Sequence, residues 1–198
     1  MQSDDVEFDG EKVVNLKTKE EITRKEIGNK VMCSSNAPLS ATEAFSSPVS
    51  PPPFMVGIAE VEIDKETGVV EPIDYAAVVD CGTVVNPNLA RVQTEGGIAQ
   101  GIGMALYEDI IYSEKGKNYS NSFMQYKIPS RLDVGEIRVE FESSYEPTGP
   151  FGAKSIGEIV INTPSPAISN AVQNAVGVIV RELPITAEKV YKGMAEKE

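Results

Sequence analysis

Histidine is absent from this sequence, and cysteine occurs only twice among its 198 residues. Without histidine, a Ser-His-Asp triad, a Cys-His pair and any His-ligated zinc or iron site are excluded within this chain. Cys33 and Cys81 form neither a disulfide framework nor a CxxC metal motif, so we expect each to be a buried thiol. Catalysis would therefore depend on carboxylates, lysine, tyrosine, backbone amides or a cofactor.

Long apolar runs and excess positive charge are also lacking. No apolar stretch approaches the roughly 20 residues needed to cross a bilayer, and the acidic start at residues 1–5 is unlike a signal peptide. The net charge of -12, from 30 acidic and 18 basic residues, argues against nucleic acid binding and favours simple solubility. We expect a cytoplasmic chain with no membrane partner.

The composition, which is 41% hydrophobic, allows one sizeable core or two small lobes. Residues 1–50 read as a peripheral segment, in which Thr23 and Glu26 form a capping box at the start of a short helix. Four prolines among residues 48–53 then indicate an extended connector. Residues 51–198 follow as a second domain.

Strand patterns dominate the first part of this second domain. Alternating apolar and acidic residues at 59–64, followed by a turn at 64–68, predict a hairpin whose return begins at Val69. The apolar run at 75–79 predicts a further, buried strand, and the alternation at 137–141 predicts a half-buried one. Residues 110–117 suggest another short hairpin.

Helical patterns separate and follow these strands. Apolar residues at helical spacing predict a helix over 89–108. Terminal signals predict two C-terminal helices, one between Ser165-Pro166 and Gly177 and one from Thr186 to about Met194. A short strand is expected at 178–180. The fold class is therefore α+β, with antiparallel hairpins, a mixed sheet, a glycine-rich helix and C-terminal helices.

The central helix is unusual because residues 93–103 contain four glycines, each costing about 1 kcal/mol relative to alanine. Two explanations remain open. The helix packs closely against a strand, or a ligand approaches its backbone, with Gln93 and Gln100 offering amide groups. The pattern is neither a P-loop nor a usual dinucleotide fingerprint.

A second unusual segment, residues 146–158, has two prolines and three glycines and predicts a rigid, shaped loop. It ends with Lys154, Ser155 and Glu158 ahead of an apolar pair. Desolvation there would raise the pKa of Glu158 and suit a general base. The alternative is an ordinary surface glutamate that caps the loop or pairs with Lys154.

The run 149–158 resembles the active-site loop of the xanthine dehydrogenase and aldehyde oxidoreductase family of molybdenum hydroxylases. Other segments resemble landmarks of that family in the same order, namely residues 60–64 with Thr67-Gly68, Asp80-Cys81-Gly82 with Asn86-Pro87, Gln93 with Gly96-Gly97 and residues 100–103, residues 126–129, and Leu183-Pro184 with residues 187–189. Together they cover roughly residue 51 to the C-terminus. The chain thus resembles the C-terminal part of the molybdenum-binding large subunit.

The resemblance implies an enzyme that oxidises a carbon next to nitrogen, or an aldehyde carbon, with water as the oxygen source. Its metal is held by a pyranopterin, in the cytosine dinucleotide form, and by no protein side chain. Glu158 would be the base toward a molybdenum-bound hydroxyl. The implied cofactor contacts, all within residues 51–198, are Gln93, Gly96, Gly97, Gln100, Gly101, Lys154 and Ser155.

The resemblance also implies partners, because family subunits are far longer than this chain. These are the remaining portion of the molybdenum subunit, an FAD subunit, and an iron-sulfur subunit with two [2Fe-2S] clusters. The loop at 145–156 is closest to purine-oxidising members, so xanthine or hypoxanthine leads, and nicotinate or another N-heterocycle stays open. The competing reading is a non-catalytic truncated remnant, or structural domain, that binds no cofactor by itself.

Overall fold

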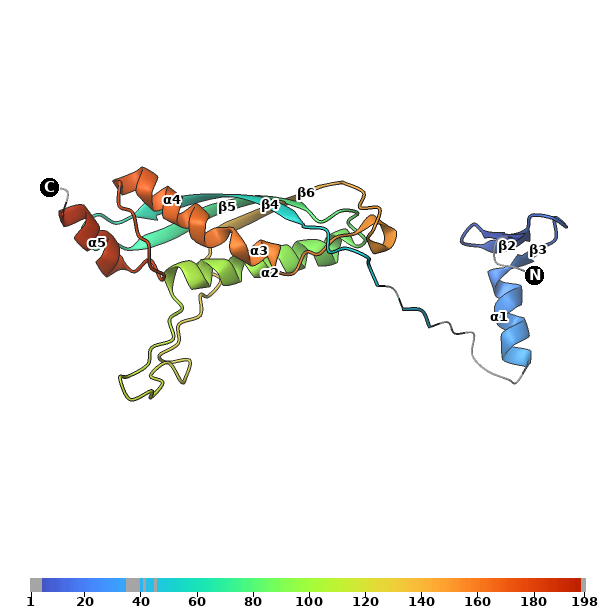
Figure 1. The fold of residues 1–198 in the computed structure, drawn as a ribbon, viewed down its shortest axis with the longest axis horizontal. Coiled ribbons are helices and arrows are strands. Elements are labelled where there is room, and N and C mark those ends of the chain that lie inside the picture. The colour runs from blue at the N-terminus through green and yellow to red at the C-terminus, as the bar shows by residue number, and fades with distance from the viewer. Residues whose placement is uncertain (1–4, 35–39, 41, 45, 197–198) are drawn as a thin grey trace. The chain divides into compact units, whose positions relative to one another are not determined.

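The computed structural model describes residues 5–34, 40, 42–44 and 46–196, which fall into two compact units, Met1–Phe45 and Ser46–Glu198 (Figure 1). The acidic start at residues 1–5, which we read as unlike a signal peptide, lies outside the described residues except for Asp5. Within the described part of the chain, no helix combines the length and apolar character required to cross a membrane.

The N-terminal unit contains a small antiparallel sheet and one helix. Its strands are β1 (Val6–Phe8), β2 (Lys12–Asn15) and β3 (Glu21–Thr23), paired in the order β1-β2-β3, and α1 (Arg24–Cys33) follows directly. The sequence predicted the helix and missed the three strands, which are too short for a clear alternation.

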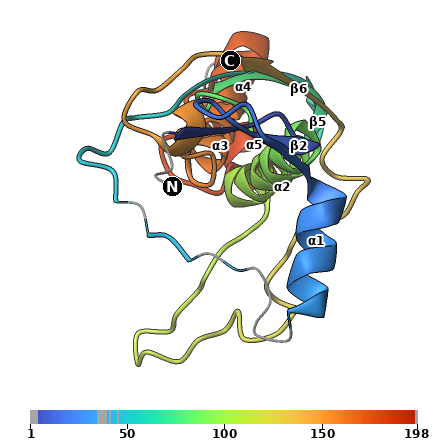
Figure 2. The ribbon, with the colours of Figure 1, turned by 90° about the vertical axis from the view of Figure 1, so that its right-hand side faces the viewer.

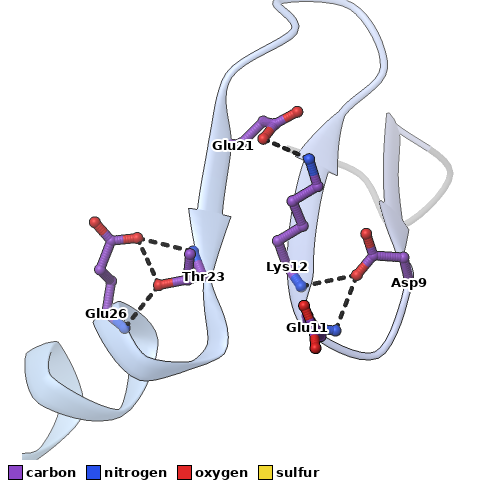
Figure 3. A network of polar contacts seen from close by, with 6 residues as sticks. All are labelled: Asp9, Glu11, Lys12, Glu21, Thr23 and Glu26. Atoms are coloured by element: carbon purple, nitrogen blue, oxygen red, sulfur yellow. Dashed lines mark hydrogen bonds and ion pairs between the residues drawn. The ribbon is translucent and has the colours of Figure 1, made fainter.

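The start of α1 confirms the predicted capping box, shown in Figure 3. The Thr23 hydroxyl accepts a hydrogen bond from the Glu26 N–H at 3.2 Å, and the Glu26 carboxylate accepts one from the Thr23 N–H at 2.8 Å. At the other end of α1, Cys33 is exposed, so the prediction of a buried thiol was wrong there. The reason is that α1 buries none of its residues.

The C-terminal unit is built on a three-stranded mixed sheet, in the order β4-β5-β6. Strand β4 (Phe54–Ile63) pairs antiparallel with β5 (Val70–Asp80), and β5 pairs parallel with β6 (Glu136–Glu142). Burial alternates along β4 and β6, so one face of the sheet is covered and the other is open. The predicted α+β class and mixed sheet are confirmed.

Strand β5 corrects one detail of the sequence prediction. The return of the hairpin at Val70 and the apolar run at 75–79 are one continuous strand, although Pro72 lies between them. A bulge between Glu60 and Val61 of β4 shifts the register at this proline, which cannot donate to the ladder. Pairing with β6 starts only at Asp74, beyond it.

The helices α2 (Pro87–Leu106), α3 (Ile159–Asn162) and α4 (Pro164–Val176) pack along the covered face of the sheet, and α5 (Ala187–Ala195) follows (Figure 1). The largest fully buried side chains come from both the sheet and the helices. They include Tyr75, Val79 and Val139 of the sheet and Ile98, Ile102 and Ile168 of the helices. This core sets the position of α2 and α4 on the sheet.

Two expectations near the C-terminus are corrected, and a third is confirmed. Ser165 was predicted to cap α4, with Pro166 in its first turn. The helix begins earlier, at Pro164, directly after α3, so Ser165 and Pro166 lie inside it and no side chain caps it. Residues 178–180 form no strand. Val178 is apolar because it is buried against α5 at Gly193, and not because it belongs to a sheet. The predicted stop of α4 is confirmed, because Gly177 adopts a left-handed φ of 74°.

The long connection between α2 and β6 extends away from the body of this unit in both ribbon views (Figure 2). The short hairpin predicted at 110–117 is reduced to a single bridge between Tyr112 and Asn118. At the base of this connection, the Tyr126 hydroxyl is hydrogen-bonded to the carboxylate of Glu108, which lies two residues beyond the end of α2.

Candidate functional site

The two unusual segments of the sequence meet at one groove of about 360 Å³. Its lining residues come from α2 and from the junction of the shaped loop with α3, and they are Val92, Gln93, Gly96, Gly97, Gln100, Gly157, Glu158 and Ile161. The exposed carboxylate of Glu158 thus shares a groove with two exposed glutamine amides. This volume is within the range of small-molecule sites.

The helix α2 presents different residues on its two sides. Gln93, Gly96 and Gln100, spaced three and four residues apart, are exposed on one side. Gly97 and Gly101 are buried, and Gly97 also borders the groove. The side that carries the amides is therefore the side toward which a ligand would lie.

The sequence left two explanations open for the glycines of α2, close packing and the approach of a ligand, and each explanation applies to some of them. A Cβ on Gly97 would collide with Val160 of α3, and a Cβ on Gly101 would lie 2.6 Å from Cγ of Pro164 in α4. Close packing therefore explains these two, although the partners are helices and not a strand. Gly96 has no atom within 4 Å of a built Cβ, so its backbone is open to the groove.

The loop before Glu158 is pinned to the end of β5. The ammonium of Lys154 donates to the Asp80 carboxylate at 2.6 Å, whereas the sequence offered Glu158 as its partner. This hydrogen bond, with others from the Ser144 hydroxyl and the Gly82 N–H, lowers the pKa of Asp80 to about 2. The sequence indicated Asp80 only as part of a family motif and not as the partner of Lys154, because the two residues are 74 positions apart.

Backbone contacts support the same attachment. The Lys154 N–H donates to the Cys81 carbonyl at 2.7 Å, and the Thr83 N–H donates to the Gly152 carbonyl at 2.8 Å. Phe151, which precedes Gly152, has a left-handed φ of 55° and is 86% exposed. The loop is therefore held to the end of β5 by backbone hydrogen bonds, and it turns an aromatic ring outward.

An apolar groove of about 660 Å³ adjoins the first one and shares Val92, Gln93 and Gly157 with it. Its walls are the segment after β5, the start of α2 and the shaped loop, and they include Cys81, Val84, Leu89, Lys154 and Ile156. Cys81 is buried as predicted, and burial raises the pKa of its thiol. Apolar walls beside polar groups suit an organic ligand.

The remaining predicted site residue, Ser155, lies elsewhere. It is exposed and lines a separate hollow on the connector side of the loop, with Ser47 and Pro51. Nothing in the described part of this chain desolvates Glu158, because its side chain is exposed. No cluster of three or more acidic or cysteine side chains among these residues could hold a metal ion.

The donor set of the groove fits an organic cofactor better than a directly bound metal ion. It offers two side-chain amides, open helix backbone at Gly96 and one carboxylate. Amides can donate to and accept from the edge of a heterocycle, whereas a lone carboxylate gives a metal too few ligands. The groove is also open to solvent, since Gln93, Gln100 and Glu158 are exposed.

Comparison with known proteins identifies the family. The family model described as "Molybdopterin cofactor-binding domain" matches residues 1–135, which include the whole N-terminal unit. The chain is 36% identical to the "6-hydroxypseudooxynicotine dehydrogenase complex subunit gamma" of Paenarthrobacter nicotinovorans over 142 residues, covering 70% of this chain and 18% of that protein. It is 35% identical to the "Probable hypoxanthine oxidase XdhD" of Escherichia coli K12 over 160 residues, covering 79% of this chain and 16% of that protein.

A solved structure shares the fold. Quinoline 2-oxidoreductase from Pseudomonas putida 86 superposes with a TM-score of 0.81 at 28% identity, covering 98% of this chain and 26% of that one. The chain therefore spans about a sixth of the length of the curated relatives described above, and about a quarter of this structure.

Proposed function

The chain belongs to the molybdopterin cofactor-binding family of xanthine dehydrogenase-type molybdenum hydroxylases, and from this premise we propose that residues 51–198 form one wall of such an enzyme's active site, with Glu158 as its base. One observation carries the proposal. Glu158 is far in sequence from Gln93 and Gln100 of α2, and all three line the same groove.

We assign a role to each of the predicted cofactor residues. Gln93 and Gln100 hydrogen-bond the cofactor through their amides, and the backbone at Gly96 approaches it most closely, because nothing covers that position. Gly97 and Gly101 act indirectly, since they let α3 and α4 pack against α2. Lys154 and Ser155 contribute to the site through the loop that carries them.

The chemistry of the bound molybdenum cofactor is a two-electron oxidation that uses water as the oxygen source. The role of this chain is to hold and position groups around it. The Glu158 carboxylate accepts a proton at the groove, and such a base contributes roughly 10²–10⁴-fold to a rate. The glutamine amides orient the cofactor relative to that carboxylate.

The rest of the active site lies on protein outside this chain. We propose that the remaining molybdenum-subunit portion covers the groove, and that its apolar surface desolvates Glu158 and so raises its pKa to suit a base. An FAD subunit and an iron-sulfur subunit with two [2Fe-2S] clusters carry the electrons away. The cofactor is the cytosine dinucleotide form, and the compartment is the cytoplasm.

For the substrate, we propose a purine, with xanthine or hypoxanthine first. The likeness to a protein described as a hypoxanthine oxidase supports this choice. The two other proteins compared above are named for different N-heterocyclic compounds, 6-hydroxypseudooxynicotine and quinoline. A screen of purines, nicotinate and quinoline with the assembled enzyme separates these substrate classes.

The test of the base is Glu158→Gln in the enzyme purified with its natural partners. We expect turnover to fall by at least 10²-fold while the molybdenum content stays near that of wild type. The matched control is Glu140→Gln, which alters an exposed glutamate on β6 away from the groove. Turnover of Glu158→Gln within a few-fold of wild type would contradict the assignment, and protein without molybdenum would favour a non-catalytic domain.

A further inference from the structure

Glu158 lies between two anchors that both lead to strand β5. Four residues before it, Lys154 binds Asp80 at the end of the strand at 2.6 Å. Five residues after it, Thr163 accepts a hydrogen bond at 3.0 Å from the hydroxyl of Tyr75, in the middle of the strand. The short segment that carries the base is therefore attached at both ends to the best-buried strand of the sheet.

We propose that the Asp80–Lys154 ion pair is a positioning device, which holds the loop so that the Glu158 carboxylate stays in the groove opposite Gln93. This inference rests on the proposed function, because it takes Glu158 as the base. It assigns Lys154 to Asp80 and not to the cofactor, and it makes both residues positioning residues.

The surroundings of the pair support this role. The side chains of Lys154 and Asp80 are only 8% and 23% exposed. Asp80 also accepts from the Ser144 hydroxyl at 2.6 Å and from the Gly82 N–H at 3.0 Å. The Lys154 ammonium lies 5.4 Å from the ring centroid of Phe54. Both charges are therefore engaged within the protein, and a shielded pair is little weakened by salt.

A second ion pair on the same strand provides a matched control. Asp74 of β5 binds Arg138 of β6, and the Arg138 side chain is 60% exposed. This pair joins two strands and has no bond to the loop before Glu158. Loss of the Asp74 charge therefore removes an ion pair from β5 and leaves the Lys154 anchor in place.

The first test measures amide hydrogen exchange of the full chain without cofactor. In Asp80→Asn and Lys154→Met we expect the amides of Lys154 and Thr83 to exchange at least tenfold faster, because these N–H groups bond across the loop attachment. Asp74→Asn leaves both rates near those of wild type, and Lys154→Arg restores most of the protection. Unchanged exchange in both Asp80→Asn and Lys154→Met overturns the proposal.

The second test measures kinetics of the molybdenum-loaded enzyme. We expect Lys154→Met to lower kcat by about 10–100-fold with KM and molybdenum content near wild type, since small displacements of a reacting group are costly. Lys154→Arg recovers most of kcat, and Asp74→Asn leaves it unchanged. A loss of molybdenum in Lys154→Met shows direct cofactor binding and overturns the proposal, as does a kcat within twofold of wild type.

Different results would contradict the role of Glu158 as the base and the positioning role of Lys154. If Glu158→Gln retains turnover, the proposed function is wrong, and the catalytic part of the positioning proposal falls with it. If Glu158→Gln is inactive and Lys154→Met is fully active, only the positioning proposal is wrong. Hydrogen exchange of the cofactor-free chain gives a result in either case, since it does not depend on the identity of the base.

Discussion

Val160 of α3 packs directly onto the backbone of Gly97 in α2, and it is fully buried there. No side chain separates the two helices at this point. Because Glu158 lies two residues before Val160 and Gln93 lies one helical turn before Gly97, this contact sets the spacing between the two polar groups of the groove. The glycine is thus a structural requirement of the site.

The effect of a methyl group at this contact is testable with two neighbouring glycines. We expect Gly97→Ala to lower the free energy of unfolding by about 1–2 kcal/mol, since overpacking against Val160 outweighs the gain in helix propensity. Gly96→Ala meets no atom, so it should raise that free energy by up to about 1 kcal/mol. Urea unfolding of the full chain measures both, and equal effects would refute the packing argument.

The anchor at Tyr75 is testable in the same way. Burial raises the pKa of the Tyr75 hydroxyl, which therefore stays protonated and donates to Thr163. We expect Tyr75→Phe to lower the free energy of unfolding by about 0.5–1.5 kcal/mol. Thermal or urea unfolding gives the value, and an unchanged stability would show that the hydrogen bond contributes nothing.

A double variant tests why position 57 is glycine. A Cβ on Gly57 would collide with the Tyr75 hydroxyl, so Gly57→Ala should cost about 1–3 kcal/mol in the native background. The cost should be smaller in a Tyr75→Phe background, since the colliding oxygen is gone. Additive effects of the two substitutions would contradict this account of the glycine.

Acid should weaken the Asp80 anchor in a defined range. The pKa of Asp80 is lowered from 3.8 to about 2, so the unfolded chain binds the proton more readily and the stabilisation is present above about pH 4. This stabilisation is lost as the pH falls from about 4 to about 2. It contributes at most about 2 kcal/mol to the free energy of unfolding. Urea unfolding of wild type and Asp80→Asn should give a difference that narrows over this range. A difference independent of pH would show that the charge is not responsible.

The capping box of the N-terminal unit gives a local prediction. Thr23→Ala removes the oxygen that accepts from the Glu26 N–H, and it should destabilise α1 by about 1 kcal/mol (Figure 3). Faster hydrogen exchange of the Glu26 amide measures this change, while Thr23→Ser should preserve the protection. Equal exchange in the alanine and serine variants would exclude a capping role for the hydroxyl.

Local signals in the sequence were sufficient for several features. The alternation at 137–141 predicted β6, the capping box predicted the start of α1, and Gly177 predicted the end of α4. Each of these depends on a few neighbouring residues, whose side-chain spacing and backbone preferences act over one or two turns. The ordered motifs between residue 51 and the C-terminus likewise indicated the family.

Other features depend on residues that are distant in sequence. The sequence could not show that Lys154 binds Asp80, that Val160 covers Gly97, or that a Cβ at Gly96 would meet no atom. Local patterns specify which residue types occur and at what spacing, whereas the packing of α3 and α4 on α2 decides which side of a helix is covered.

The same division holds for Glu158. Its sequence context marked it as the candidate base, and the tertiary structure placed it on an open groove beside Gln93. Its exposure could not be read from the apolar pair that follows it, because Val160 turns inward while the carboxylate turns outward. The sequence by itself determined the chemical groups of the site, and only the folded chain decided their arrangement, since contacts between distant segments position each side chain.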